Sequence, residues 1–194
     1  TTLIRLITGI QNPTSGEYSL YNIKNTDMAI NKTRRRMGAV VETPAVYLDM
    51  TAEENLIMQY QILGIPNYNG ITELLTLVSL ADCGKKKVKD FSLGMKQRLG
   101  IAVALCGSPD FLILDEPING LDPQGIVEIR ELILKLNHDY QITILISSHI
   151  LGELSKLATH YGFVDGGKIV KEIDATELEL NCRKCTHLSV TDTK

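Results

Sequence analysis

Residues 111–117 read FLILDEP, a continuous apolar run that ends in two carboxylates and a proline. An apolar run without alternation is typical of a strand that is buried on both faces, as in a parallel sheet. Two adjacent carboxylates at the tip of such a strand lose hydration unless a cation or a reacting proton compensates them. Asp115 is therefore a candidate ligand for Mg²⁺ and Glu116 a candidate for polarising a water molecule. The simpler alternative is a strand that merely enters solvent.

Outward from this stretch, short apolar runs alternate with amphipathic segments. Residues 142–146 form a second apolar run, and residues 37–41 form a shorter one. The spacing predicts helices over about 94–107 and 123–138, the second capped by Asp122. Apolar strands that alternate with amphipathic helices indicate an α/β domain whose parallel sheet is covered by helices on both faces.

Turn and capping signals predict the remaining elements. Thr51 and Glu54 form a capping box, because the Thr hydroxyl and the Glu carboxylate can each accept from a free backbone N–H group at a helix start. The helix that they open is expected to end near Leu63. The pattern further predicts helices over 3–10, 71–81 and from Ile150, and strands over 17–22, 161–164 and 168–173, the last two joined as a hairpin.

Other polar residues fall at the predicted ends of these elements, and open α/β sheets bind ligands beyond the carboxyl ends of their strands. Ser92 and Gly94 precede a helix whose free N–H groups can bind an anion, although the same pair also makes an ordinary cap and turn. His149 follows the second apolar run, either as a structural residue or as a functional one. Residues 119–122, NGLD, either belong to the site or serve only as the N-cap turn that ends at Asp122.

The chain opens on TTLIRL, which has the form of the segment after the lysine of a phosphate-binding loop. In such a loop backbone N–H groups bind the phosphates and the next Ser or Thr hydroxyl coordinates Mg²⁺, so Thr1 is a candidate ligand. We therefore expect a domain that lacks its N-terminal strands and most of its phosphate loop. Residues 188–190 look like another strand, so truncation is expected on the C-terminal side as well.

Composition limits the classes of function. The 194 residues have a net charge of -3, with 44% hydrophobic and 22% charged side chains, which suits one globular domain. The mild negative charge disfavours a general nucleic-acid binder, and no apolar run approaches the roughly 20 residues of a membrane span. Any membrane role is therefore expected to come through a partner. Cys182 and Cys185 have CxxC spacing, but a closed zinc site needs more ligands, so reduced thiols are the simpler interpretation.

Taken together, the order of these motifs resembles the nucleotide-binding domain of ATP-binding cassette (ABC) proteins over nearly the whole chain. The matching segments are Thr1-Thr2 (end of the phosphate loop), 40–44 (Q-loop), 91–95 (signature), 112–117 (Walker B), 119–122 (D-loop) and His149 (switch histidine). The resemblance implies a P-loop NTPase-type fold, with a helical and signature subdomain over about residues 43–100 of one domain spanning 1–194.

The resemblance implies that the site binds ATP and Mg²⁺. Asp115 and Thr1 would hold the metal, Glu116 would be the general base for hydrolysis, and His149 would contact the terminal phosphate. Glu42 stands where the family usually has Gln. Its carboxylate remains a candidate for metal and nucleotide binding, but it adds negative charge beside the phosphates. Because the lysine of the phosphate loop is absent, the chain by itself is expected to be inactive.

Further residues of the resemblance would bind the nucleotide. Thr2 and Asp122 would do so, and Ser92 and Gly94 would contact ATP that is held by a second subunit in a head-to-tail dimer. The signature keeps this Ser and Gly but has Leu93 where the family usually has Gly. The resemblance therefore implies that each complete site combines residues from two subunits.

The SLGM signature, the Glu at the Q-loop position and residues 47–56 look like the bacitracin and lantibiotic export subgroup. This implies the ATPase of a peptide-antibiotic or multidrug exporter, at the cytoplasmic face of a bacterial membrane. Its partners would be a second copy, forming a homodimer, and a transmembrane permease docked on residues 43–70, with no nucleic acid. The alternatives are a soluble ABC ATPase acting in translation or DNA maintenance, and an ATP-binding regulatory subunit.

Overall fold

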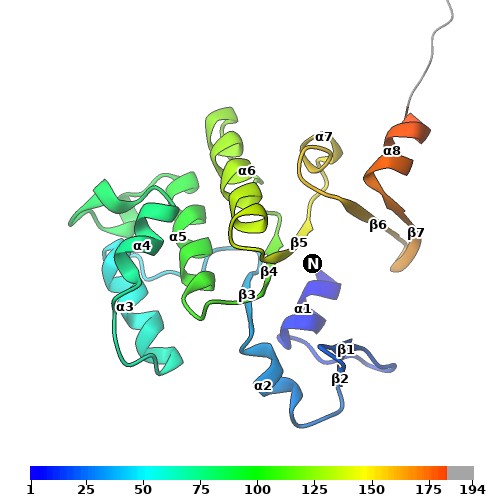
Figure 1. Cartoon of the computed structure of the whole chain (residues 1–194), viewed down its shortest axis with the longest axis horizontal. Coiled ribbons are helices and arrows are strands. Elements are labelled where there is room, and N and C mark those ends of the chain that lie inside the picture. The colour runs from blue at the N-terminus through cyan, green and yellow to red at the C-terminus, as the bar shows by residue number, and fades with distance from the viewer. Residues whose placement is uncertain (183–194) are drawn as a thin grey trace, which may run out of the picture. The chain divides into compact units, whose positions relative to one another are not determined.

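The computed structural model describes residues 1–182, and three of its strands form the parallel sheet predicted from the apolar runs (Figure 1). The strands β3 (Met37–Val40), β4 (Phe111–Asp115) and β5 (Thr143–Ser147) lie in the order β3-β4-β5. Leu112, Ile113 and Leu114 have no exposed surface. Since successive residues of a strand point to opposite faces, both faces of β4 are covered, as the unbroken apolar run predicted.

Two long helices pack against this sheet. Helix α5 (Leu93–Leu105) contacts β3, and α6 (Pro123–His138) contacts β5. A Cβ atom at Gly38 of β3 would lie 2.3 Å from the backbone oxygen of Ala104, so the glycine allows α5 to approach the strand closely. Asp122 caps α6 by accepting from the Gly125 N–H group at 3.1 Å, which confirms the predicted helix start.

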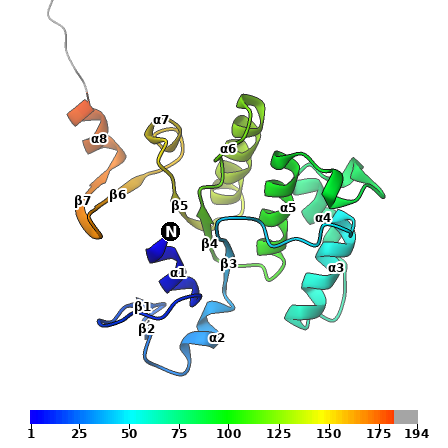
Figure 2. The same ribbon diagram turned by 180° about the vertical axis from the view of Figure 1, so that it is seen from behind.

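A group of three helices follows β3 in the chain and lies to one side of the sheet (Figures 1 and 2). It consists of α3 (Ala52–Leu63), α4 (Ile71–Leu77) and α5, which contact one another. The predicted capping box opens α3, with Thr51 Oγ1 accepting from the Glu54 N–H group and Glu54 Oε2 accepting from the Thr51 N–H group. Helix α4 ends earlier than predicted, because Ser79 has a φ of 55°, outside helical geometry.

Two short 3₁₀ turns, Ala81–Cys83 and Val88–Asp90, connect α4 to α5. The second turn is tied to the segment before α3 by backbone hydrogen bonds. The Val88 N–H group donates to the Met50 oxygen at 2.9 Å, and the Lys89 N–H group donates to the Leu48 oxygen at 2.8 Å. The entry to α3 and the entry to α5 are therefore joined directly through the backbone.

The N-terminal region contains α1 (Thr2–Thr8), β1 (Ser19–Leu20), β2 (Ile23–Lys24) and α2 (Ile30–Arg34). Tyr21 and Asn22 form the turn between β1 and β2 with φ of 50° and 65°, the positive values that a two-residue hairpin favours. The strand predicted over 17–22 is thus only a short part of a hairpin. The Tyr21 hydroxyl and Arg36 both donate to Asp110, just before β4, and hold the hairpin there.

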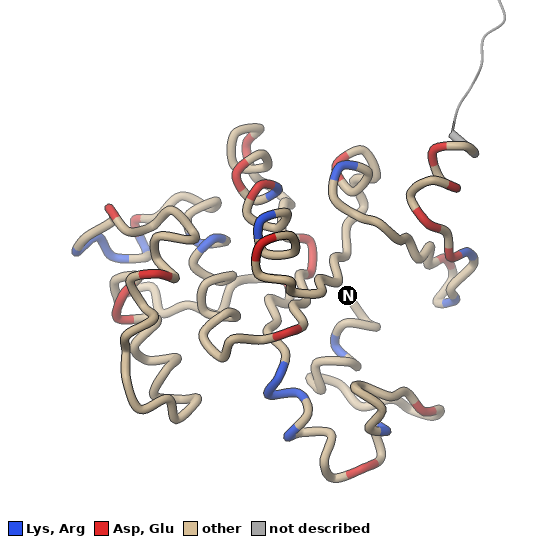
Figure 3. The backbone as a smooth tube through the Cα atoms, in the orientation of Figure 1, with Lys and Arg blue, Asp and Glu red and all other residues tan. Residues whose placement is uncertain are grey.

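Charged residues are spread along the backbone of these elements, as Figure 3 shows. The basic run 32–36 lies on and after α2, and the run 85–89 lies in the connection before α5. Both runs consist largely of exposed or partly exposed residues, Val88 being the buried exception. They are therefore solvated faces of two different elements.

The chain divides into two compact units, of which the first spans Thr1–His149 and the second begins at Ile150. The second unit contains α7 (Leu151–Leu154), an antiparallel hairpin of β6 (His160–Asp165) and β7 (Lys168–Asp174), and α8 (Ala175–Cys182). The predicted hairpin is confirmed, while the helix predicted from Ile150 is short. The strand predicted at 188–190 and Cys185 lie outside the described residues. Within residues 1–182, no helix has the length and apolar character needed to cross a membrane.

Candidate functional site

The carboxyl ends of the three parallel strands bring the candidate residues to one edge of the sheet. Val40 pairs with Leu114, and Leu114 pairs with Ile146, so the strands end at the same level. The residues that follow these pairs are Glu42 after β3, Asp115 and Glu116 at β4, and Ser147 to His149 at β5. This edge is where open α/β sheets bind ligands.

Asp115 is the buried carboxylate of the site, with 1% of its surface exposed. Its Oδ1 atom accepts hydrogen bonds from the Ser147 hydroxyl and, at 3.3 Å, from the Thr1 hydroxyl. Its Oδ2 atom is also buried and has no hydrogen-bond partner among the described residues. A buried carboxylate oxygen without a partner is unfavourable unless a ligand satisfies it, which marks Asp115 as a binding group.

Glu116 faces the opposite way from its neighbour. It has a φ of 50°, an uncommon conformation for a residue with a side chain, and its N–H group donates to both the backbone oxygen and the hydroxyl of Ser147 at 3.1 Å. Its side chain is 29% exposed, and Oε2 lies 2.9 Å from Nδ1 of His149. The structure therefore brings the two predicted catalytic residues into direct contact.

Glu42 lies at the same edge but interacts with a different group. Its φ is 61°, and its Oε1 atom accepts from Nη2 of Arg5 on α1. Among the residues that the structure describes, no three His, Cys, Asp or Glu side chains gather as a metal site. The structure thus brings Thr1 to Asp115, as predicted, whereas the Glu42 carboxylate is held by Arg5.

Ser92, Gly94 and Asp122 form a second group, at the starts of α5 and α6. Ser92 is the N-cap of α5, and its hydroxyl accepts from the Met95 N–H group at 3.2 Å. A Cβ atom on Gly94 would lie 3.9 Å from Leu121 Cδ2, so the signature is next to the loop before α6. Among the described residues, the hydrogen bonds of Ser92 and Asp122 and the neighbours of Gly94 do not involve Asp115 or Glu116. Thr2 is exposed at the first turn of α1.

Sequence reasoning gave no role to two residues that the structure places in the site. Ser147 bonds to both Asp115 and the Glu116 backbone, and Arg5 holds Glu42. The sequence signal for Ser147 was its position directly after the apolar run 142–146. For Arg5 it was the spacing of one helical turn from Thr1, which places both side chains on one face of α1. Each signal becomes specific only when the facing strand is known.

The geometry combines two chemical capacities at one edge. Asp115 and Thr1 offer hard oxygen donors in a buried position, the donor type that Mg²⁺ prefers. Glu116 offers a carboxylate that solvent reaches and that an imidazole orients, the arrangement of a general base. A charged ligand and a water molecule would therefore meet at this edge.

Comparison with known proteins gives a family match. The model of the family described as "ABC transporter" matches residues 1–119, and that of "AAA domain, putative AbiEii toxin, Type IV TA system" matches residues 84–155. The bacitracin transport ATP-binding protein BcrA of Bacillus licheniformis is 46% identical over 99% of the chain. The lantibiotic transport ATP-binding protein SrtF of Streptococcus pyogenes is 42% identical over 91% of the chain, which covers 75% of that protein.

The chain spans part of these relatives. It covers 62% of BcrA from Bacillus licheniformis and 63% of BcrA from Enterococcus faecalis, which is 40% identical. Among solved structures, the dimeric ATP-binding cassette MJ0796, in a post-hydrolysis state with ADP and Pi bound, superimposes with a TM-score of 0.78 at 24% identity, over 90% of this chain and 79% of that one. CbiO1 of Clostridium perfringens superimposes with a TM-score of 0.79 at 24% identity, over 92% of this chain and 74% of that one. The fold is therefore that of an ATP-binding cassette.

Proposed function

Because the chain belongs to the ABC transporter family, we propose that it is the ATP-binding and ATP-hydrolysing subunit of an exporter of peptide antibiotics. The observation that supports this most strongly is the pairing of a buried Asp115, which contacts Thr1, with an exposed Glu116, which contacts His149. The identity to bacitracin and lantibiotic transport ATP-binding proteins supports this class of substrate.

ATP and Mg²⁺ are the ligands that this edge of the sheet would take. The residues fit a divalent cation, since Asp115 Oδ2 is buried without a partner and the Thr1 hydroxyl lies beside the same carboxylate. A bound Mg²⁺ would neutralise charge on the phosphates. The chain itself orients the metal-binding carboxylate, because the Ser147 hydroxyl donates to Asp115 Oδ1 and fixes its rotamer.

Hydrolysis of ATP requires mainly positioning and charge stabilisation, and Glu116 and His149 would supply part of both. Glu116 Oε2 would accept the proton of the attacking water. The two hydrogen bonds from its backbone N–H group to Ser147 hold the peptide that carries it. His149, 65% exposed at its side chain, would contact the terminal phosphate while orienting Glu116.

A second copy of the chain would complete each site. Ser92 and Gly94 open a helix of 13 residues, whose N-terminal N–H groups and dipole favour a phosphate. Ser92 is exposed and Gly94 is partly exposed, so a facing subunit can reach both. The solved structure of MJ0796 with ADP and Pi is dimeric, which supports a homodimer here.

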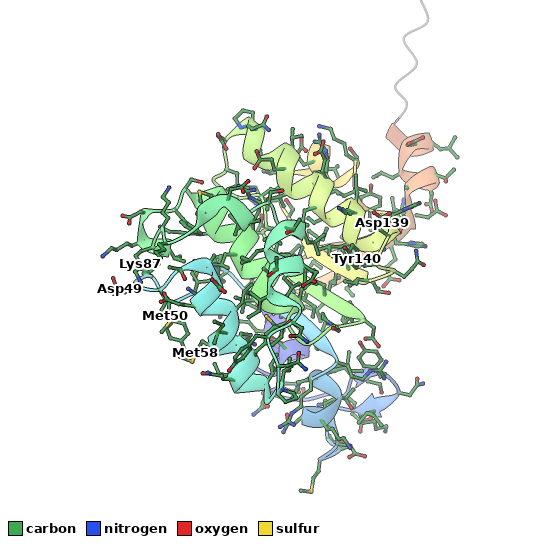
Figure 4. All side chains as sticks on the ribbon, turned by 60° about the vertical axis from the view of Figure 1, so that its left-hand side comes forward. Asp49, Met50, Met58, Lys87, Asp139 and Tyr140 are labelled. Atoms are coloured by element: carbon green, nitrogen blue, oxygen red, sulfur yellow. The ribbon has the colours of Figure 1, made fainter. Side chains whose placement is uncertain are left out.

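The proposed docking surface for a transmembrane permease is residues 43–70. It includes the exposed side chains of Tyr47 and Leu48, each 50% exposed. Next to them lies a hollow of about 300 Å³. Figure 4 labels four of the residues that line it, Asp49, Met50, Met58 and Lys87. It is lined by Asp49, Met50, Glu54, Ile57, Met58, Gln61 and Lys87. Flexible Met side chains beside charges of both signs suit an amphipathic segment of a partner, which would place the chain at the cytoplasmic face of the membrane.

Substitution of the proposed base tests the function. Glu116→Gln should retain ATP binding, slow hydrolysis by about 10²- to 10⁴-fold and accumulate an ATP-bound dimer, because the amide cannot accept the proton. ATPase rates, nucleotide binding and gel filtration with ATP measure these effects in the complete ATPase domain, including its phosphate loop. Glu131→Gln, an exposed carboxylate on α6, is the matched control and should leave hydrolysis unchanged. Undiminished hydrolysis by Glu116→Gln would remove Glu116 from the mechanism.

A further inference from the structure

Helix α1 and its N-cap residue Thr1 lie at the carboxyl edge of the sheet. The side chains of Thr1 and Arg5, one helical turn apart, both reach this edge. Thr1 contacts Asp115 after β4, and Arg5 contacts Glu42 after β3. Residues spaced by four lie on the same face of a helix, so one face of α1 is aligned with both strand ends. Arg5 therefore takes part in the same edge as the metal-binding carboxylate.

Glu42 places a further negative charge at this edge. The strand β3 is the direct neighbour of β4, and Val40 pairs with Leu114, the residue before Asp115. Neighbouring strands lie about 4.8 Å apart, so the chain leaves β3 next to the strand end that carries Asp115 and Glu116, and Glu42 follows Val40 by two residues. These carboxylates repel one another and any phosphate, unless a cation of the chain offsets the additional charge.

We propose that Arg5 is a positioning residue that neutralises Glu42 and so makes a carboxylate compatible with ATP at this edge. The Arg5 guanidinium contacts Glu42 Oε1, and the positive φ of Glu42 turns the chain at that point. The side chains of Arg5 and Glu42 are 40% and 53% exposed, so solvent screens the pair and its contribution to folding stability is small. The ion pair acts instead on the affinity for ATP. The role of Arg5 rests on the proposed function of the chain as an ATPase.

Removal of the arginine charge alone tests the proposal. Arg5→Gln should raise KM for ATP about fivefold to tenfold, because an unpaired Glu42 charge then repels the phosphates in both ground and transition states. The value of kcat should stay within about twofold, since uniform binding is what is lost. Arg5→Lys keeps the charge and should stay near the unsubstituted chain. These constants are measured by steady-state ATPase assays of the complete ATPase domain, including its phosphate loop, together with its membrane partner.

The double variant separates a charge effect from a structural one. Arg5→Gln combined with Glu42→Gln should have a KM within about twofold of that of Glu42→Gln alone, because with Glu42 neutral the loss of the arginine leaves no charge unpaired. The exposed pair of Lys24 and Glu17, 2.7 Å apart, is the matched control. Neutralising Lys24 should leave KM unchanged.

Two results would overturn the proposal. One is an unchanged KM in Arg5→Gln, and the other is a raised KM that persists when Glu42 is also neutral. A melting temperature within a few degrees of the starting chain shows that the variants are folded, so neither result can be assigned to unfolding. If the unsubstituted chain with its partner binds no ATP, the proposed function fails. Normal ATP hydrolysis together with an unaffected Arg5→Gln contradicts only the role of Arg5.

Discussion

At the scale of single residues, Asp115 and Glu116 are neighbours in sequence but occupy opposite environments. Asp115 is 1% exposed at the end of β4, whereas the Glu116 side chain is 29% exposed. The positive φ of Glu116 produces this difference, because it turns the chain out of the sheet within one peptide unit. A buried carboxylate suits metal binding and a solvent-accessible one suits proton transfer, so the backbone conformation is consistent with the two roles proposed above.

Ser147 is the residue that connects these two carboxylates. Ser147→Ala removes the donor to Asp115 and one acceptor of the Glu116 N–H group. We expect kcat for ATP hydrolysis to fall about tenfold, through loosened positioning. The free energy of unfolding should fall by about 1 kcal/mol, the usual net value of a hydrogen bond. ATPase assays and urea titrations of the same samples measure the two effects.

The matched control for this substitution is Ser155→Ala. Its hydroxyl donates to the Gly152 backbone oxygen at 3.0 Å, within the second unit and with no bond to a proposed site residue, so kcat should be unchanged. If Ser147→Ala lowers stability but leaves kcat at its starting value, Ser147 only supports the fold. A fall in kcat without any change in stability is compatible with the assigned role.

The candidate site was partly predictable because some of its residues belong to a recognisable pattern within one short segment. A carboxylate pair after an apolar run is visible in residues 112–116 alone. The contacts of Arg5 and Ser147 are not, because each joins positions that are 31 or more residues apart in the chain. Which strands are neighbours, and which helix crosses their ends, is decided by packing. Sequence patterns therefore identify candidate groups more readily than the partners that orient them.

At the scale of elements, strong local signals correctly predicted the longer helices and the strands β4 and β5, of which β4 is buried and β5 is half-buried. Capping groups mark the starts of α3 and α6, and unbroken apolar runs mark β4 and β5. The β1–β2 hairpin was not predicted as such, since its turn is held by the bonds of Tyr21 and Arg36 to Asp110, far along the chain. The early end of α4 likewise depends on packing that its own sequence does not reveal.

The capping box of α3 makes that helix sensitive to acid. The backbone N–H group of Thr51 and then Lys87 lower the pKa of Glu54 below its ordinary 4.5. A carboxylate with a lowered pKa in the folded chain contributes stability that is fully present above the unfolded pKa and is lost as pH falls through the folded pKa. Stability should therefore decline as pH drops below about 5, which urea midpoints measured between pH 3 and 7 would show.

Glu54→Gln provides the comparison for this pH dependence. The amide can still accept from the Thr51 N–H group, but it has no charge to lose, so the decline between pH 5 and 3 should be smaller. Glu53, exposed on the same first turn of α3, gives the matched substitution Glu53→Gln. Equal pH profiles for Glu54→Gln and the unsubstituted chain would exclude Glu54 as a source of the acid sensitivity.

At the scale of the whole molecule, the signature serine is assigned to a site on another subunit. Ser92→Arg should abolish ATP hydrolysis, because the long side chain would occupy the phosphate position in the dimer, while the affinity of the monomer for ATP changes less than about twofold. Hydrolysis rates, together with equilibrium binding of ATP at concentrations that keep the chain monomeric, test this. A loss of monomer binding would place Ser92 in its own subunit's site.

The N-cap role of Ser92 requires its own control. Its hydroxyl caps α5, so any substitution also removes a helix cap that is worth about 1 kcal/mol. Ser92→Ala loses the same cap without added bulk and should keep more hydrolysis than Ser92→Arg. If both variants lose activity equally, the loss reflects the start of α5 and not obstruction of a facing site.

The backbone bonds between residues 48–50 and 88–89 give the molecule a property that side chains do not encode. They join the proposed docking surface to the segment that enters α5, and Ser92 follows Lys89 after two residues. Backbone hydrogen bonds of this kind use no side-chain atom, so any residue except proline can supply the two N–H donors. In the transporter proposed above, substitutions on the docking surface would therefore change the choice of permease without weakening this backbone connection to the signature. Partner choice and force transmission would then be free to evolve separately.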